Sequence, residues 1–280
     1  MMHISDDRLD FFVEEDVPYL DLTCEVLGVG SQPGRMTFLT RDPGVVCCTE
    51  EAARICQRAG AEVVELKPSG TPIVAGDTLL MVEGPAAALH RAWKVSLNLL
   101  DHMSAVATKT AQFVSKVKTV NPDVEVLTTR KSQPGVKDLM TKAIRCGGAF
   151  PHRLGLSETV LVFDNHLEFI GGFDAFLEQV PQLKKRCIEK KLFVEVSANQ
   201  ALTAAKAGVD SLQIEKTDPA FLADLVEQLR DVNPNVTVIA AGGVNMGNCE
   251  AYAATGIDGI VTTCLFSAPP LDMTAKMTSL

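Results

Sequence analysis

The sequence contains no pair of cysteines separated by two residues, although it has eight cysteines among its 280 residues. Cys47 and Cys48 are adjacent, and the other six are scattered along the chain. Zinc sites and small disulfide frameworks usually show closely spaced, repeated cysteines, so both are disfavoured here. The pattern is typical of reduced core thiols and predicts a cytoplasmic protein.

The sequence is also short of positive charge and of long apolar runs. There are 26 Lys and Arg against 35 Asp and Glu, which gives a net charge of -9. This argues against nucleic-acid binding, which needs a basic surface, but it leaves room for a small basic pocket. No apolar run reaches about 18 residues, so we expect no membrane span. The start, MMHISDDRLDFF, has no basic region followed by an apolar segment, so we expect no signal peptide.

The sequence has enough apolar residues for a sizeable core, with 46% hydrophobic and 22% charged residues. Its pattern changes near residue 120. Before that point, Leu89, Trp93 and Leu97 recur at helical spacing and predict a long helix from Gly84 that ends at Asn121. Upstream of this helix we expect strands at 36–40, 45–49, 63–66, 71–74 and 78–83, the first two joined by a turn at 41–44, and a helix at 50–59.

After residue 120, short apolar segments alternate with amphipathic ones. This alternation predicts a parallel sheet covered by helices, and six or more units favour a closed barrel over an open sheet. The expected strands are 124–129, 159–163, 192–196, 211–215, 236–241 and 259–263. The expected helices are 135–146, 174–187, 199–207, 219–230 and 247–254.

Charged residues and glycines stand where these strands end or begin, and in a barrel the carboxyl ends of the strands form the site. The predicted site residues are Arg130, Lys131, His152, Arg153, Glu195, Glu215, Lys216, Gly242, Gly243, Thr262 and Thr263.

Each residue type has a physical use at such a site. Arginine grips a carboxylate or phosphate with two hydrogen bonds, so Arg130 and Arg153 fit an acidic substrate. The Gly242-Gly243 pair before a helix lets a phosphate approach backbone N–H groups. Glu195 and Glu215 could hold ribose hydroxyls or share a Mg²⁺ ion with a diphosphate. Taken singly, each has a plainer interpretation as a tight turn, a solvated loop, a surface charge pair or a structural histidine.

Several segments resemble one family, the quinolinate phosphoribosyltransferases. TTRKSQPGVKDLMTKAIRCGGAFPHRLGLSETVLVFDNH (128–166) resembles the family's central signature. VSLNLLDHMSAVAT (95–108) looks like its helix segment, EEDVPYLDLT (14–23) its opening, and VEV, QIEK and AAGGV its later strand ends. The resemblance covers nearly the whole chain in order, and it is closest to the ModD branch, named for its place beside molybdate transport genes.

The resemblance implies an N-terminal α/β sandwich (1–108) and an incomplete α/β barrel (109–280), of the type II phosphoribosyltransferase kind. It implies transfer of phosphoribosyl from phosphoribosyl diphosphate, with Mg²⁺ and no organic cofactor, to a small acidic or heterocyclic acceptor. Lys131, Glu195 and Glu215 would be catalytic; Arg130, His152, Arg153 and Lys216 would bind substrate; Gly242, Gly243, Thr262 and Thr263 would bind phosphate. It also implies a homodimer or higher even oligomer, in which Lys94 reaches the partner's site.

The sequence departs from the family at four places. The family's Glu-Arg on the long helix is Trp93-Lys94 here, and its lysine before Asp-Asn-His is Phe163. Its Asp-Asn after the fourth strand is Glu215-Lys216, and its acidic residue before Thr-Arg-Lys is Thr128. The pocket is therefore less cationic, and we expect poor use of quinolinate.

Three alternatives remain at this stage. One is a non-catalytic nucleotide- or anion-binding protein linked to molybdate transport. Another is a lipoyl- or biotinyl-type carrier, since GDTLLMVEG (76–84) shows that strand pattern, although Gly84-Pro85 follows where an acceptor lysine is needed. The third is an aldolase-type barrel, for which only Lys131 or Lys216 is placed as a Schiff-base lysine.

Overall fold

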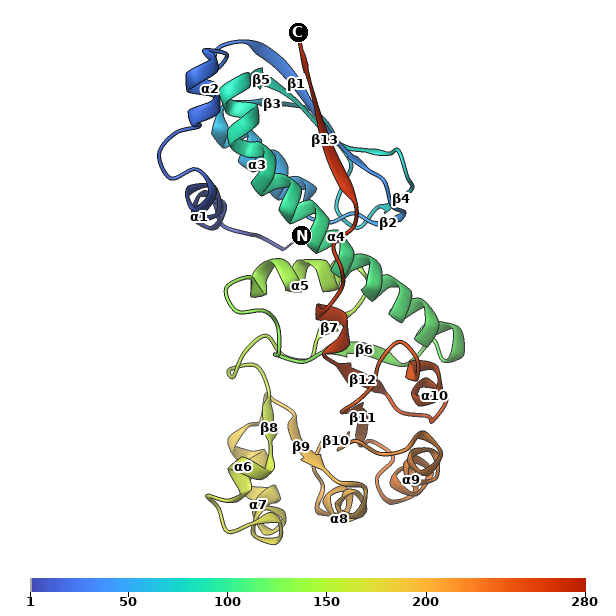
Figure 1. Ribbon diagram of the computed structural model, residues 1–280. Helices are drawn as coiled ribbons and strands as arrows, with labels where there is room; N and C mark the ends of the chain where they lie inside the picture. Colours follow the sequence, from blue (N-terminus) through green and yellow to red (C-terminus); the bar gives the residue numbers. More distant parts are fainter. Residues whose placement is uncertain (1) are drawn as a thin grey trace. The chain divides into compact units, whose positions relative to one another are not determined.

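The computed structural model describes residues 2–280, and the chain divides into two compact units (Figure 1). The first covers the chain up to Gln112 together with Ser132–Gly148 and Phe266–Leu280. The second covers Phe113–Lys131 and Ala149–Leu265. The domain boundary at 108/109 stays a prediction. Within the described residues, no helix is long and apolar enough to cross a membrane.

The first unit is built on a four-stranded antiparallel sheet in the order β13-β1-β5-β3. Along β1 the buried and less buried positions alternate, so Met36 and Phe38 enter the core while their neighbours stay nearer the surface. The strands are β1 (Pro33–Thr40), β3 (Glu62–Leu66), β5 (Thr78–Pro85) and β13 (Met273–Ser279), with a separate pair β2 (Gly44–Val45) and β4 (Pro72–Ile73). The helices are α1 (Asp6–Asp16), α2 (Leu22–Leu27), α3 (Thr49–Ala59), α5 (Lys137–Cys146) and α4 (Ala86–Val120) as far as Gln112, the rest of α4 being assigned to the second unit.

The hairpin expected from strands 36–40 and 45–49 is wrong. Strand β1 pairs with β5 and β13, whereas β2 ends at Val45 and pairs with β4. Cys48 adopts a left-handed conformation with φ of 66° and caps helix α3, which begins at Thr49. Residues 46–49 are buried where the chain enters helix α3. The periodicity of so short an apolar run does not distinguish a strand from the approach to a helix.

The second unit is a curled sheet of seven parallel strands in the order β7-β6-β12-β11-β10-β9-β8. Among the described residues β7 and β8 do not pair, so the barrel is incomplete. The strands are β6 (Glu125–Thr128), β7 (Phe150–Pro151), β8 (Val160–Val162), β9 (Leu192–Val196), β10 (Ser211–Glu215), β11 (Thr237–Ala241) and β12 (Gly259–Thr262). The helices are α6 (Asp164–Leu167), α7 (Phe173–Arg186), α8 (Ala198–Ala207), α9 (Pro219–Val232) and α10 (Cys249–Ala253), with a 3₁₀ turn η1 (Cys264–Phe266) at the end of the unit.

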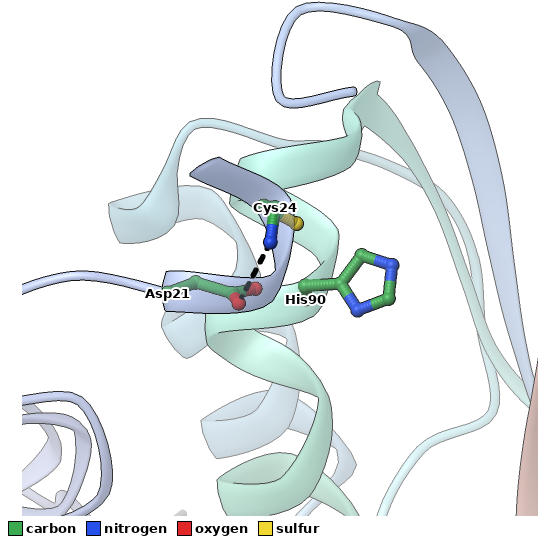
Figure 2. Close-up of side chains that lie close together, drawn as sticks. All are labelled: Asp21, Cys24 and His90. Atoms are coloured by element: carbon green, nitrogen blue, oxygen red, sulfur yellow. Dashed lines mark hydrogen bonds between the residues drawn. The ribbon is translucent and has the colours of Figure 1, made fainter. Parts of the chain in front are cut away.

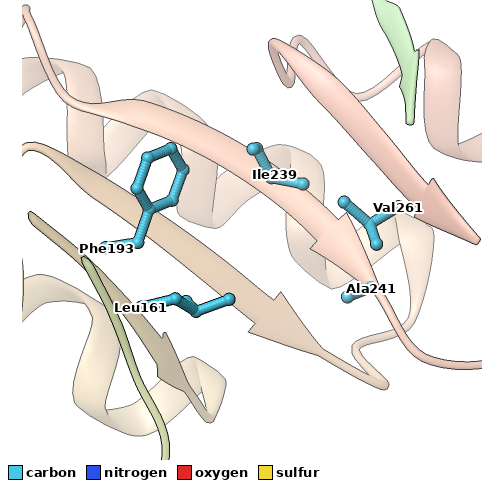
Figure 3. Close-up of a cluster of buried hydrophobic side chains, with 5 residues drawn as sticks. All are labelled: Leu161, Phe193, Ile239, Ala241 and Val261. Atoms are coloured by element: carbon cyan, nitrogen blue, oxygen red, sulfur yellow. The ribbon is translucent and has the colours of Figure 1, made fainter. Parts of the chain in front are cut away.

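The fold class is confirmed, and the closure favoured by strand count alone is wrong. Strand β7 is only two residues long and contains Pro151, which has no N–H to donate to a neighbouring strand. The interior of the sheet is filled by apolar side chains from β8, β9, β11 and β12 (Figure 3). They are Leu161, Phe193, Ile239, Ala241 and Val261, with Leu127 and Phe163 packed against them.

Candidate functional site

The principal pocket of the second unit, about 680 Å³ in volume, lies at the carboxyl ends of its strands. Parallel strands bring their ends to one edge, which is why residues far apart in sequence meet here. The pocket is lined by Arg130, Lys131, His152, Arg153, Glu195, Glu215, Lys216, Gly242, Gly243, Thr262 and Thr263, which are all the predicted site residues except Lys94.

Lys94 lies on helix α4 in the first unit, and its side chain is exposed. Its Nζ lies 4.8 Å from the ring centroid of Trp93, a distance at which an ammonium is attracted to the aromatic face. The role foreseen for Lys94 concerns the pocket of a partner subunit, so it stays a prediction.

One end of the pocket is formed by the glycine turn after β11. Gly242 and Gly243 both have positive φ, 79° and 80°. A Cβ on Gly242 would lie 2.8 Å from Cγ of Lys216 and 3.1 Å from Cγ of Glu215, so the first position requires glycine for space as well as for conformation. Within residues 2–280 the amides of Gly243 and Val244 have no hydrogen-bond partner, and both residues line the pocket.

The helix after this turn contributes less than the sequence suggested. Helix α10 has only five residues. The loop before it satisfies its own amides, because Asn245 N donates to Asn248 Oδ1 and Gly247 N donates to Asn245 Oδ1. The amides available to a phosphate are therefore those of the turn, not those of the helix.

Thr262, the last residue of β12, supports this turn, and Thr263 follows it. The buried Thr262 hydroxyl donates to the carbonyl of Val244 at 2.7 Å and accepts from the amide of Cys264. The hydroxyls of Thr263 and Thr129 lie 2.9 Å apart and are hydrogen-bonded to each other. Thr262 thus holds the turn in place, while Thr263 is nearer to the pocket surface.

The pocket is also lined by two glutamates in different surroundings. Glu195 on β9 is partly buried and accepts a hydrogen bond from the Gln213 side chain. Burial, together with Glu215 and Asp164 nearby, raises its pKa despite that hydrogen bond and Lys131. Glu215 instead pairs with Lys216 at 2.8 Å, and this contact raises the pKa of Lys216. Gln213 was not foreseen, although a polar residue within the apolar strand SLQIE is a usable signal.

The other end of the pocket is basic and aromatic. His152 and Arg153 directly follow β7, a strand that the sequence did not predict, and they therefore also stand at a strand's carboxyl end. Arg153 is buried, and its Cζ lies 5.8 Å from the ring centroid of Phe163. Its pKa is lowered by burial and by the charge of Arg130. His152 packs edge-on against Phe193, and burial followed by Arg153 lowers its pKa.

The carboxylates of this pocket fit a Mg²⁺ ion only if a bound substrate supplies further oxygen ligands. Glu195 and Glu215 are near enough for their charges to interact, but no group of three metal-binding side chains occurs at this pocket within the described residues. Mg²⁺ usually binds through one or two carboxylates plus substrate phosphates, and it keeps several waters. These two glutamates would therefore hold a magnesium diphosphate rather than the free ion.

A second group of potential metal ligands lies in the first unit, formed by Asp21, Cys24 and His90 (Figure 2). Asp21 caps helix α2 by accepting from the amides of Thr23 and Cys24. Burial, with a hydrogen bond to Asp21, raises the pKa of the Cys24 thiol to about 11. The thiol is thus neutral at physiological pH, and the cap itself accounts for the contact between Asp21 and Cys24.

The chain matches two family models along most of its length. They are "Quinolinate phosphoribosyl transferase, N-terminal domain" over residues 21–104 and "Quinolinate phosphoribosyl transferase, C-terminal domain" over residues 106–276. ModD of Rhodobacter capsulatus, which carries the name of a pyrophosphorylase, is 41% identical over 259 residues, covering 91% of this chain and 98% of that protein.

Two further comparisons point the same way. A protein from Methanothermobacter thermautotrophicus, named as a carboxylating nicotinate-nucleotide pyrophosphorylase, is 30% identical over 281 residues, covering 98% of this chain and 99% of its own. The crystal structure of NadC from Streptococcus pyogenes matches with a TM-score of 0.90 at 23% identity, covering 100% of both chains. That structural likeness concerns the fold.

Proposed function

The chain belongs to the quinolinate phosphoribosyl transferase family, and from that premise we propose that its pocket joins phosphoribosyl diphosphate to a small acidic heterocycle. It is a phosphoribosyltransferase-type pyrophosphorylase, and the non-catalytic alternative is not favoured. The finer parts of the proposal are the acceptor, the Mg²⁺ ion, an even oligomer with Lys94 at the partner's site, a cytoplasmic location and a link to molybdate transport.

One observation carries the proposal: the pocket is lined by a glycine turn, a buried arginine and two carboxylates, which suit different chemical groups. The free amides of Gly243 and Val244 suit a phosphate, while the buried guanidinium of Arg153 suits a carboxylate. Glu195, on β9, also lines this pocket. A donor rich in phosphate and an acidic acceptor could thus bind side by side, with the reacting carbon of the sugar near Glu195.

The chemistry follows from this order. Attack on the sugar carbon passes through a cation-like state as the bond to diphosphate breaks, and a nearby carboxylate stabilises that charge. Glu195 is the better placed of the two glutamates, because Glu215 is already paired with Lys216. Mg²⁺, when bound with the diphosphate, would neutralise the leaving group. Arg153 would orient the acceptor by its carboxylate.

The test is release of diphosphate from phosphoribosyl diphosphate and Mg²⁺ by the purified chain, with a panel of pyridine and other heterocyclic acids. Release that depends on the acceptor supports the proposal. Glu195→Gln should abolish release while the protein still binds phosphoribosyl diphosphate in calorimetry. Failure of the wild-type protein to bind that donor at all would contradict the proposed function.

A further inference from the structure

We infer that the acceptor carries a single carboxylate, which Arg153 binds, and that Phe163 excludes acceptors with a second carboxylate on the adjacent ring carbon. The inference rests on the proposed function, because it names the substrate class of the same pocket. It concerns two residues that follow β7 and β8 and face each other at the acceptor end of the pocket.

Arg153 is a buried cation that has no ion-pair partner among the described residues. It is only 8% exposed, yet within residues 2–280 no carboxylate lies within ion-pair distance of its guanidinium group. Its contacts are the Phe163 ring and the repulsive charge of Arg130. A buried cation without an anionic partner is costly, and the cost is relieved when a carboxylate enters the pocket. A neutral acceptor would leave this cation unpaired.

The other cationic side chains of the pocket are less able than Arg153 to bind the acceptor. Lys216 pairs with Glu215 at 2.8 Å, and both Lys216 and Lys131 have exposed side chains, where solvent and salt weaken their attraction for an anion. Arg130 is exposed, where solvent and salt weaken its attraction for an anion. The lowered pKa of His152 keeps its imidazole neutral at pH 7. Arg153 is thus the one buried positive charge that the described residues of a single subunit offer to an acceptor in this pocket.

The residue beside the Arg153 guanidinium is Phe163, an apolar aromatic side chain. The Phe163 side chain packs against the apolar interior of the barrel, the cluster shown in Figure 3 that includes Leu161 and Phe193. Its backbone amide donates to His166 Nδ1 at 3.0 Å, and its ring stacks on that imidazole, so the ring is held in place. An acceptor gripped by Arg153 therefore turns its neighbouring edge toward an aromatic face. A carboxylate on that edge would be desolvated without a partner.

The reaction with such an acceptor balances without loss of carbon dioxide. The lone pair of the ring nitrogen forms the bond to the sugar carbon, and the bond from that carbon to diphosphate oxygen breaks. The electron pair leaves with diphosphate. No carbon–carbon bond is broken, so the single carboxylate stays on the product.

The test measures binding first and turnover second. Calorimetry with the wild-type chain should show a pyridine monocarboxylate binding about 10-fold or more tighter than a pyridine dicarboxylate with adjacent carboxylates, and tighter than the carboxamide. Phe163→Lys should narrow or reverse the preference between the two acids. Phe163→Leu, the matched control, keeps the position apolar and should retain the preference for the monocarboxylate.

The outcomes separate the two proposals. Equal or tighter binding of the dicarboxylate by the wild-type chain overturns this inference, whether or not Phe163→Lys folds. If the monocarboxylate is preferred in binding but no acceptor yields diphosphate, the proposed reaction fails while the specificity stands. If turnover occurs with the dicarboxylate as well as with the monocarboxylate, the reaction stands and the role of Phe163 fails.

Discussion

Each unit contains a buried cation, and the two differ in whether they have an ion-pair partner. Lys142 in the first unit is 4% exposed and contacts the carboxylates of both Glu50 and Glu51. Arg153 in the second unit is 8% exposed and, within the described chain, contacts an aromatic ring but no carboxylate. Folding supplies the partners of Lys142, whereas Arg153 lacks one until a ligand arrives. The contrast separates a charge that stabilises the fold from a charge that is kept for binding.

The largest expected effect tests the first half of that contrast. Lys142→Met should lower the free energy of unfolding by about 3–5 kcal/mol, because it removes the cation that pairs with the buried carboxylate of Glu51 and the partly buried one of Glu50. Arg153→Met, the matched control, should cost less than about 1 kcal/mol, since it removes an uncompensated charge. Denaturant unfolding of the two variants measures both values. Equal losses would mean that the two cations do the same structural work.

The second effect tests the other half. Arg153→Ala should weaken acceptor binding by about 10- to 100-fold, as expected for a hydrogen bond to a charged group. Affinity for phosphoribosyl diphosphate should hardly change, because that donor is assigned to the other end of the pocket. Calorimetry with each ligand gives the two affinities. A parallel loss for both ligands would show that Arg153 shapes the whole pocket.

The sequence was informative where structure depends on local pattern. The six expected barrel strands all occur, because fully buried parallel strands are continuous apolar runs. The polar residues at their ends then converge by geometry alone. Pairings between distant segments could not be predicted: β13 has only one buried residue among partly exposed and exposed ones, yet it pairs with β1. The ion pairs of Lys142 and the placement of Arg153 over Phe163 depend on the same long-range packing.

A smaller effect concerns the glycine turn at the phosphate end. Gly242→Ala should lower stability by about 1–2 kcal/mol, because its Cβ would press on Lys216 and φ of 79° is unfavourable for alanine. Gly243→Ala is the control, because Gly243 has a similar φ but open space around its Cβ, so this variant should lose only the stability due to backbone conformation. The additional loss of stability in Gly242→Ala, measured by thermal melts, is the steric part. We also expect Gly242→Ala to bind phosphoribosyl diphosphate more weakly.

The smallest effect concerns the carboxyl group of Asp101, which lies in the first unit but, unlike Lys142, has no ion-pair partner there among the described residues. One of its oxygens is buried without a hydrogen-bond partner. Burial and the charge of Asp272 raise its pKa from 3.8 to about 6, against the opposing influence of Lys94. A carboxyl whose folded pKa exceeds its unfolded value opposes folding when it is ionised. The folded state therefore gains stability as the pH falls from about 6 toward 3.8.

Asp101→Asn removes that charge while keeping the shape of the side chain. Because the residue is only partly buried, the gain at pH 7 should be modest, about 1 kcal/mol. The gain should shrink as the pH falls and vanish near pH 4, where the wild-type carboxyl is protonated in the folded state. Glu50 titrates with the opposite sign, since ion pairing with Lys142 and hydrogen bonds from Ser69 overcome burial and lower its pKa to about 2. Its contribution cancels when the two proteins are compared at each pH. A gain that does not vary with pH would mean that Asp101 acts through packing, and not through the cost of burying an unpaired charge.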